Sequence, residues 1–323
     1  MCRPREDENC DYAATELTWR TEQLGSDTLP VEVIIRGGWR ALESNCTTPL
    51  LFVRFNSEST QGTPFEGQDV LPLTTHCGQG LSLKSVRNRV NPSQYEQYLL
   101  KEFLAYRLYN LYNEVSLKVR LVNISYPDPD KPKKARTTHA FFTEHFDSLA
   151  ARTGTMVMDR WTLDPEKLDT WAADKLALYQ YMIGNTDWSI GRQRNILLLE
   201  SSGGVQTAVP FDLDMSGLVN AHYAGPPPTL PIEKVTQRYY LGYCHPNVDW
   251  ERLYQVFIDN QDAVFEMLEA LPGLDRNNRR SAEYFLARFF DTVQSDKDCE
   301  RRIASNCQPW PPTEDDHMNI KGK

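Results

Sequence analysis

The chain lacks any hydrophobic run long enough to cross a membrane. No apolar stretch among its 323 residues approaches the roughly 18 residues that a spanning helix needs, and the opening residues contain no apolar signal core. An excess of positive charge is missing too. The formal net charge of −9 gives no electrostatic attraction to nucleic acid or to an anionic membrane. We therefore expect no transmembrane segment and no nucleic-acid partner.

Several familiar motifs are also absent. The cysteines show no Cys-x-x-Cys spacing, which argues against a zinc site built on paired cysteines. No Gly-x-Ser-x-Gly elbow occurs, which argues against an α/β-hydrolase. Gly37-Gly38 and Gly78-Gln79-Gly80 have too few glycines for a strong phosphate-loop signal.

The seven cysteines are many for a reducing compartment. Cys2 and Cys10 are near each other in the chain, as are Cys299 and Cys307, so we expect each pair to be able to form a short-loop disulfide. Disulfides persist in oxidising compartments. This favours a periplasmic or secreted protein, with a cytoplasmic location as the alternative.

Short apolar runs dominate the first half of the chain and helical patterns the second. Strands are expected at 31–35, 50–55, 70–73, 117–126 and 139–144, and helices at 93–111, 168–183, 250–271 and 282–293. Strands followed by helices are the α+β pattern. We divide the chain into a tail or lead-in (1–28), a strand-rich lobe with one helix (29–145), a helix-rich lobe (146–307) and a flexible tail (308–323).

The main candidates for catalytic and metal-binding residues lie between positions 181 and 217. A predicted helix ends at Gly184, and the loop after it carries Asn185, Asp187 and Asn195. The hairpin 196–211 follows and leads directly into Asp212 and Asp214. Such a hairpin brings Asn195 and the two carboxylates to the same end. Mg²⁺ prefers oxygen ligands and usually takes one or two carboxylates from a protein, so we expect Asn195, Asp212 and Asp214 to hold Mg²⁺ or Mn²⁺. Which aspartate is the main ligand stays open.

This stretch resembles a known superfamily. The run Gly184-Asn185-x-Asp187, then Asn195 and Pro210-Phe211-Asp212, is similar to the catalytic and metal loops of the atypical kinase-like superfamily. That superfamily includes HipA-type, phosphoinositide and spore-coat CotH-type kinases. Longer strings around these loops resemble a group of uncharacterised bacterial proteins. The resemblance covers roughly residues 50 to 245 and implies a bilobal protein-kinase-like fold, ATP as cofactor, and Asp187 with Asn185 as catalytic residues.

The resemblance has two departures. Seven residues, 188–194, separate Asp187 from Asn195, more than in HipA-type and phosphoinositide kinases, so the loop must bulge. Arg194 stands where related sequences often carry histidine.

Three further residues are candidates for nucleotide binding. The expected helix 93–111 begins with a capping box at Ser93 and Glu96 and carries Glu102. In a protein kinase, the glutamate of such a helix pairs with a strand lysine that contacts the nucleotide. Lys84 is the candidate lysine, although another alignment places Pro72 at that position and leaves no lysine. Glu144, at the end of the strand 139–144, is the candidate for adenine or ribose contact.

Three functions follow from these patterns. The first is an ATP- and Mg²⁺-dependent phosphotransferase acting on an unidentified protein, lipid or sugar. The second is a non-catalytic binding module on a degenerate kinase fold, which a missing nucleotide lysine would favour. The third is a metal-dependent phosphohydrolase that uses water as acceptor.

Overall fold

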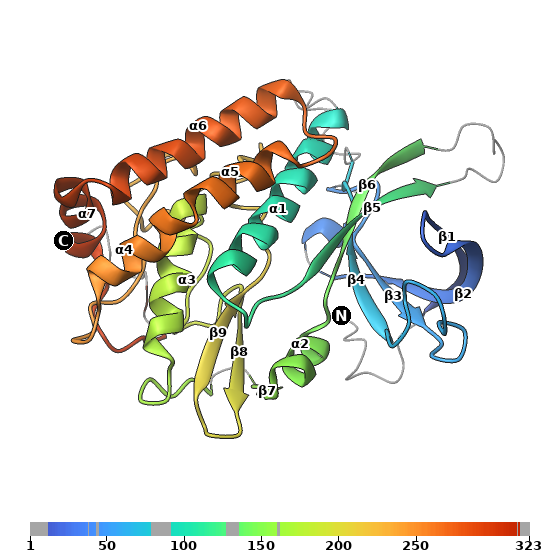
Figure 1. Cartoon of the computed structure of the whole chain (residues 1–323), viewed down its shortest axis with the longest axis horizontal. Helices are drawn as coiled ribbons and strands as arrows, with labels where there is room; N and C mark the ends of the chain where they lie inside the picture. The colour runs from blue at the N-terminus through green and yellow to red at the C-terminus, as the bar shows by residue number, and fades with distance from the viewer. Residues whose placement is uncertain are drawn as a thin grey trace. The chain divides into compact units, whose positions relative to one another are not determined.

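The computed structural model describes residues 12–37, 39–42, 45–78, 92–126, 136–159, 162–314 and 316. The chain divides into two units (Figure 1). Unit 1 comprises Met1–Leu99 and Val119–His145, and unit 2 comprises Leu100–Lys118 and Phe146–Lys323. The expected α+β class is confirmed, because an antiparallel sheet fills unit 1 and helices dominate unit 2.

Unit 1 is built on an antiparallel sheet. The described strands are β1 (Ala13–Thr21), β2 (Gly25–Ile35), β3 (Leu51–Phe55), β4 (Val70–Thr74), β5 (Val119–Tyr126) and β6 (Arg136–Thr143), in the order β1-β2-β3-β4-β6-β5. A short 3-10 helix, η1 (Trp39–Ala41), follows β2. The strands expected from apolar runs are therefore present. β2, β3, β4 and β6 supply buried side chains such as Val53 and Leu73 to one core, and β5 packs partly buried Val122 and Ile124 against it.

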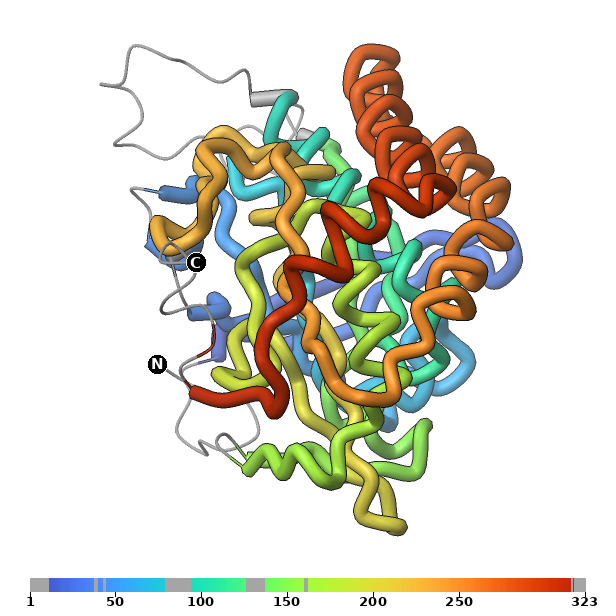
Figure 2. Tube along the Cα trace, turned by 90° about the vertical axis from the view of Figure 1, so that its left-hand side faces the viewer, coloured from blue at the N-terminus to red at the C-terminus, as the bar shows by residue number. Residues whose placement is uncertain are grey.

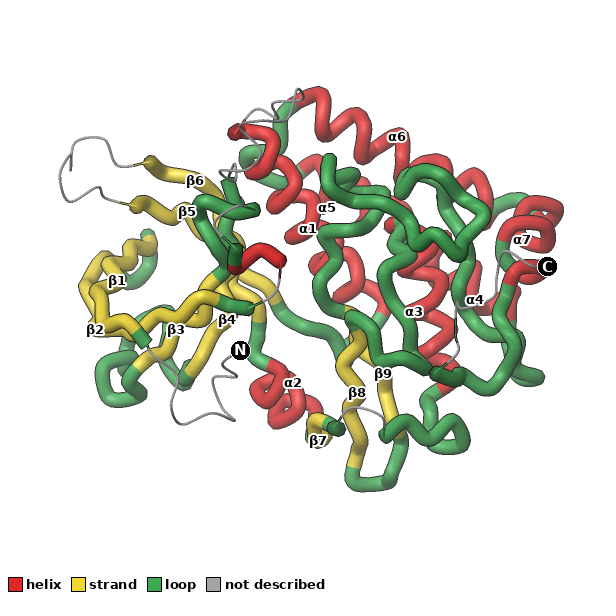
Figure 3. Tube along the Cα trace, turned by 180° about the vertical axis from the view of Figure 1, so that it is seen from behind, coloured by secondary structure: helices red, strands yellow, loops and turns green. Residues whose placement is uncertain are grey.

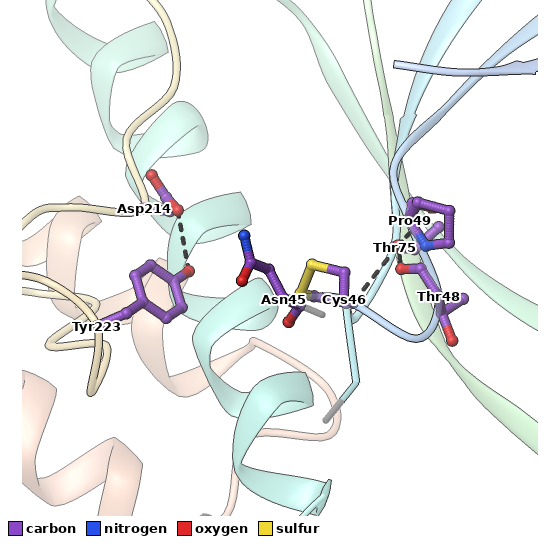
Figure 4. The surroundings of a disulfide bond; sticks show 8 residues. Asn45, Cys46, Thr48, Pro49, Thr75, Asp214 and Tyr223 are labelled. Carbon is purple, nitrogen blue, oxygen red and sulfur yellow. Dashed lines mark hydrogen bonds between the residues drawn. A yellow bond between two sulfur atoms is a disulfide. The ribbon is translucent and has the colours of Figure 1, made fainter. Parts of the chain in front are cut away.

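The core of unit 1 is closed by aromatic contacts and a disulfide. Phe65 stacks on Phe55 with ring centroids 4.7 Å apart. Cys46 is bonded to Cys77, with a Cα–Cα distance of 4.8 Å. Beside this disulfide the Thr75 hydroxyl donates to the carbonyl oxygen of Thr48 at 2.7 Å (Figure 4).

The expected lead-in at 1–28 is wrong for its described part. Residues 13–21 and 25–35 form the β1–β2 hairpin, with Thr21 paired to Gly25 across the turn. Most side chains of β1 are exposed, so the strand has little of the apolar alternation that identifies a half-buried strand. Trp19 is an exception and packs in the core.

Helix α1 (Pro92–Tyr112) confirms the expected helix, and the boundary between the units falls inside it, at Leu99. Glu96, one residue of the expected capping box, contacts the sheet. Its Oε1 atom accepts a hydrogen bond from the backbone N–H of His139 at 2.9 Å and lies 2.7 Å from Nδ1 of that residue. The carboxylate therefore binds strand β6.

Unit 2 contains most of the helices and a small sheet, as Figure 3 shows in red and yellow. Its described helices are the second half of α1, α2 (Phe146–Thr153), α3 (Thr170–Ile183), α4 (Trp250–Asp259), α5 (Gln261–Glu269), α6 (Arg276–Val293), α7 (Asp296–Arg302) and the 3-10 helix η4 (Ala304–Asn306). Strands β7 (Thr155–Val157), β8 (Ile196–Ser201) and β9 (Gln206–Pro210) form an antiparallel sheet. No helix in the described ranges is both long and apolar enough to cross a membrane.

Helix α3 is the most buried helix of unit 2. Asp169 caps its start by accepting from the Ala172 N–H at 3.0 Å. Every residue from Ala172 to Ile183 except Lys175 is buried. The Tyr179 hydroxyl donates to the carbonyl oxygen of Ala105 in α1 at 2.6 Å, so α3 is fixed against the unit 2 part of α1.

The segment after α7, the dark red end of the tube in Figure 2, corrects the expected flexible tail at 308–323. Gln308 is buried; its backbone N–H donates to Gly242 O at 2.6 Å, and its carbonyl oxygen accepts from Cys244 N–H at 2.8 Å. Asp316 is buried as well and accepts a hydrogen bond from the Tyr243 hydroxyl. The described part of this segment is therefore packed against residues 241–244.

The disulfide expected between Cys299 and Cys307 is also wrong. Cys307 is bonded to Cys244, with a Cα–Cα distance of 5.3 Å, and Cys299 is a buried free thiol. The two bonded cysteines are 63 positions apart in the chain. Their distance in the folded structure, and not their distance in the sequence, determines the pairing. The expected Cys2–Cys10 pair lies outside the described residues.

Lys101 gives the first prediction, a pH dependence of stability. Burial lowers its pKa to about 8, while Asp275 opposes the shift. The unfolded chain holds this proton up to a pH near 10.5, so the free energy of unfolding should rise with pH above the folded pKa. Between about pH 8 and pH 10 we expect wild type to gain roughly 2 kcal/mol relative to Lys101→Met. Urea unfolding of both proteins across this range measures the difference, and parallel curves would contradict the prediction.

Candidate functional site

The candidate site begins where α3 ends. Gly184 caps the helix in the left-handed conformation, with φ 64°, and its N–H donates back to Tyr181 O at 3.1 Å. A Cβ atom at this position would lie 2.8 Å from Cζ of Phe285. Glycine is therefore needed both for the turn and for the close packing that starts the next loop.

Asn185 shapes the loop that follows. Its Oδ1 atom accepts from the backbone N–H of Asp187 at 2.9 Å, an Asx turn that sets the direction of the chain. The residue is 1% exposed, and its Nδ2 atom has no hydrogen-bond partner among the described residues. Asn185 thus positions Asp187, the half-buried candidate catalytic residue.

The seven residues between Asp187 and Asn195 form a small hairpin of their own. Ser189 and Arg194 exchange two backbone hydrogen bonds of 3.0 Å, and Gln193 N–H donates to Ile190 O at the turn. The expected bulge is confirmed. The hairpin returns the chain to its starting point, so that Asn195 Nδ2 donates to Asp187 O at 2.7 Å and to Asp187 Oδ2 at 3.0 Å.

The β8–β9 hairpin brings Asp212 to the same end as Asn195. Ile196 pairs with Pro210, and one step further Phe211 N–H donates to Asn195 O at 3.1 Å. Both Asn195 and Asp212 adopt left-handed backbone conformations, with φ 51° and 57°. The Asp212 N–H donates to the hydroxyl of Tyr106 in α1 at 2.9 Å. The expected juxtaposition of Asn195 and Asp212 is therefore present.

Asp214 is held by a tyrosine. It is 6% exposed, and its Oδ2 atom accepts from the Tyr223 hydroxyl at 2.9 Å (Figure 4). Burial without a partner would disfavour an ionised carboxylate. The phenol offsets part of this cost and fixes one carboxylate oxygen.

The charge state of Asp187 reflects its neighbours. Burial raises the pKa of this carboxyl group above its ordinary value, Arg194 opposes the shift, and Asp212 and Asp214 raise the pKa further. The Arg194 guanidinium lies 2.5 Å from Asp187 Oδ1. A raised pKa makes a carboxylate a stronger base, while the arginine limits the rise.

The donor set fits a hard divalent cation. Asn195 uses its Nδ2 atom on Asp187, and its Oδ1 atom makes no hydrogen bond to any residue the structure describes. This oxygen and a carboxylate at Asp212 are ligands of the kind that Mg²⁺ takes. In the described ranges, no group of three or more His, Cys, Asp or Glu side chains is gathered as if to hold a metal.

The structure brings only some of the expected residues together. Glu102 belongs to unit 2 and is 4% exposed, as is its neighbour Lys101, so Glu102 is not a solvated helix residue. Glu144 follows β6 in unit 1. Lys84 lies outside the described residues.

Two tyrosines at the site were not expected from the sequence. They are Tyr106 in α1 and Tyr223 in the segment after β9. Their hydroxyls contact Asp212 N–H and the Asp214 carboxylate. No local pattern could have identified them, because the first pair is 106 residues apart in the chain.

Comparison with known proteins gives no family: no protein-family model matches the chain, and no curated protein or solved structure shows significant similarity to it.

Proposed function

We propose that this protein is an ATP- and Mg²⁺-dependent phosphotransferase whose catalytic loop is the Asp187–Asn195 hairpin. The observation that carries the proposal is the hydrogen bond of 3.0 Å between Asn195 Nδ2 and Asp187 Oδ2, together with the pairing of Phe211 to Asn195. A base, a neutral oxygen ligand and a carboxylate thereby meet at one hairpin end. Protein kinases use an aspartate and a metal-binding asparagine of one loop in this way.

Each residue has a distinct role in this proposal. Asp187 accepts the proton of the attacking hydroxyl or orients it, and Asn185 holds the backbone of Asp187 in place. Asn195 and Asp212 hold the cation, and Asp214 supports it while fixed by Tyr223. Bound Mg²⁺ would neutralise charge on the phosphate oxygens. Positioning and electrostatics account for most of the rate in such a reaction.

A kinase-like arrangement of the two units is part of the proposal. Helix α1 connects β4 to β5, and β4 lies beside β6 in the sheet, an order compatible with a kinase strand-rich lobe that carries one helix. We propose that Glu102, Glu144 and Lys84 contribute to nucleotide binding. The disulfides Cys46–Cys77 and Cys244–Cys307 support a periplasmic or secreted location, because such bonds persist in oxidising compartments.

One observation favours the second candidate, a binding module without phosphoryl transfer. In protein kinases the nucleotide lysine lies on the strand before the helix. Among the described residues, the last strand before α1 is β4, whose sequence Val70-Leu-Pro-Leu-Thr74 contains no lysine. Without a contact between a lysine and the nucleotide, nucleotide binding would depend more heavily on the metal site of unit 2.

Calorimetric titration of ATP with Mn²⁺ or Mg²⁺ into the protein tests both candidates. We expect metal-dependent binding in wild type that is lost in Asp212→Ala, because this substitution removes a charged ligand. Asp291→Ala is the matched control, since Asp291 is exposed on α6. Folded wild type that binds no nucleotide with either metal would overturn the phosphotransferase. Binding without any phosphate transfer would favour the module.

A further inference from the structure

Unit 2 contains a cavity of about 610 Å³ that the proposed reaction does not use. Its walls come from the segment 217–238, from α6 and from single residues of α3 and α7. Its lining includes Thr236, Arg238, Ser281, Tyr284, Arg288 and Arg302. This volume is within the range of pockets for small organic ligands.

The cavity is positively charged. Three arginines, Arg238, Arg288 and Arg302, line it, and none of its lining residues is an aspartate or a glutamate. Arg288 has no ion pair among the described residues. Arg302 has one, with Asp298, where the distance from Nε to Oδ1 is 3.3 Å. Since the chain as a whole is acidic, this concentration of arginine is a local feature.

Arg238 is fixed in place by neutral groups. Its Nε and Nη2 atoms donate to the carbonyl oxygens of Tyr181, Met182 and Phe285, at distances from 2.6 to 3.2 Å. Its guanidinium also lies over the Phe285 ring, 3.8 Å from the centroid. The Nη1 atom makes no hydrogen bond to any described residue.

No carboxylate in the described part of the chain forms an ion pair with Arg238. Burial lowers the pKa of Arg238 to about 10, and Arg288 and Arg302 add to the shift while Tyr181 opposes it. Buried charges in proteins are normally paired with an opposite charge. A rigid guanidinium with one unused nitrogen, in one cavity with two more arginines, is an arrangement suited to an anion with several oxygens.

We propose that this cavity, the arginine pocket, binds a small phosphate-bearing molecule. The three guanidinium groups match a doubly charged phosphate, and the hydroxyl groups of Thr236 and Ser281 can donate to it. Tyr284 is 68% exposed at the cavity, and its ring offers a surface for the organic part of the ligand. The cavity volume exceeds what a phosphate group alone would fill.

The test uses the whole protein without nucleotide or metal, so its result does not depend on the proposed phosphotransferase. Thermal unfolding and calorimetric titration are carried out with a hexose phosphate, the free hexose and inorganic phosphate, at matched ionic strength. We expect both phosphate compounds to bind and the free hexose not to bind. Tighter binding of the ester identifies an organic phosphate as the ligand, and equal binding shows that the phosphate group alone is recognised.

Arg288→Gln combined with Arg302→Gln removes two of the cations and leaves the structural Arg238 intact. We expect the dissociation constant for the phosphate compounds to rise roughly 10- to 100-fold, as for lost hydrogen bonds to charged groups. Arg280→Gln is the control, since Arg280 is exposed on α6 outside the cavity lining, and it should bind like wild type. The proposal is overturned if wild type binds neither phosphate compound, or if the double variant binds them as tightly as the control.

Discussion

Replacing Asp187 with asparagine is expected to lower phosphoryl transfer from ATP by roughly 100- to 10,000-fold, the usual contribution of a positioned base, while ATP and Mn²⁺ still bind. The substituted amide has nearly the same size, so Asn195 Nδ2 keeps its contact with the backbone oxygen of residue 187, which is the shorter of its two bonds. The proton acceptor is lost, whereas the proposed metal ligands Asn195 and Asp212 remain. The measurement is release of labelled phosphate to water, or transfer to the protein itself, at saturating nucleotide.

The contrast with Asp212→Ala separates the two roles. Asp187→Asn should reduce the rate with little change in the dissociation constant for nucleotide, whereas Asp212→Ala should abolish binding. The control Asp291→Ala should change neither quantity. Equal activity of Asp187→Asn and wild type would show that this carboxylate is not the base. Loss of binding in Asp187→Asn would assign it to the metal site instead.

Replacing both Cys244 and Cys307 with serine is expected to lower the free energy of unfolding of unit 2 strongly. The two cysteines are 63 positions apart, and a cross-link over a loop of this length contributes roughly 4 kcal/mol in the chain-entropy model. The bond also anchors the segment from Gln308 to Asp316 on residues 241–244. We expect a lower urea midpoint and faster proteolytic cleavage after residue 303.

Cys299→Ser is the matched control for this prediction. Cys299 is a buried free thiol in α7 whose Sγ atom contacts the carbonyl oxygen of Thr292. The substitution removes a sulfur without removing a cross-link, so we expect a loss of only about 1 kcal/mol. Equal urea midpoints for Cys299→Ser and the double variant would show that the disulfide contributes little.

The candidate site could be predicted from the sequence where local geometry determines it. A hairpin with a tight turn at 201–204 fixes its register, so the residues before β8 and after β9 had to meet, and Asn195 does pair with Phe211, the residue before Asp212. The helix end at Gly184 followed from the glycine itself. The contribution of Tyr106 and Tyr223 could not be predicted, because it depends on tertiary packing between distant segments.

The same distinction between local pattern and tertiary packing explains which predictions about the fold were wrong. The strands expected at 31–35, 50–55 and 70–73 are present because these runs are apolar, whereas β1 is largely exposed and shows no such pattern. The C-terminal segment was expected to be flexible from Pro311 and Pro312 and their polar neighbours, yet buried Gln308 and Asp316 anchor it. Cysteine pairing depends on distance in the folded chain, which sequence spacing does not report.

The bridge between Ser189 and Arg194 links the site to the C-terminal segment. These two residues pair like the stem of a hairpin, and the tip between them is packed: Ile190 is fully buried, and a Cβ atom at Gly191 would lie 2.2 Å from the carbonyl oxygen of Thr313. The number of residues between Asp187 and Asn195 is therefore limited by the segment after α7 as well as by the stem. An insertion in this tip would have to displace that segment.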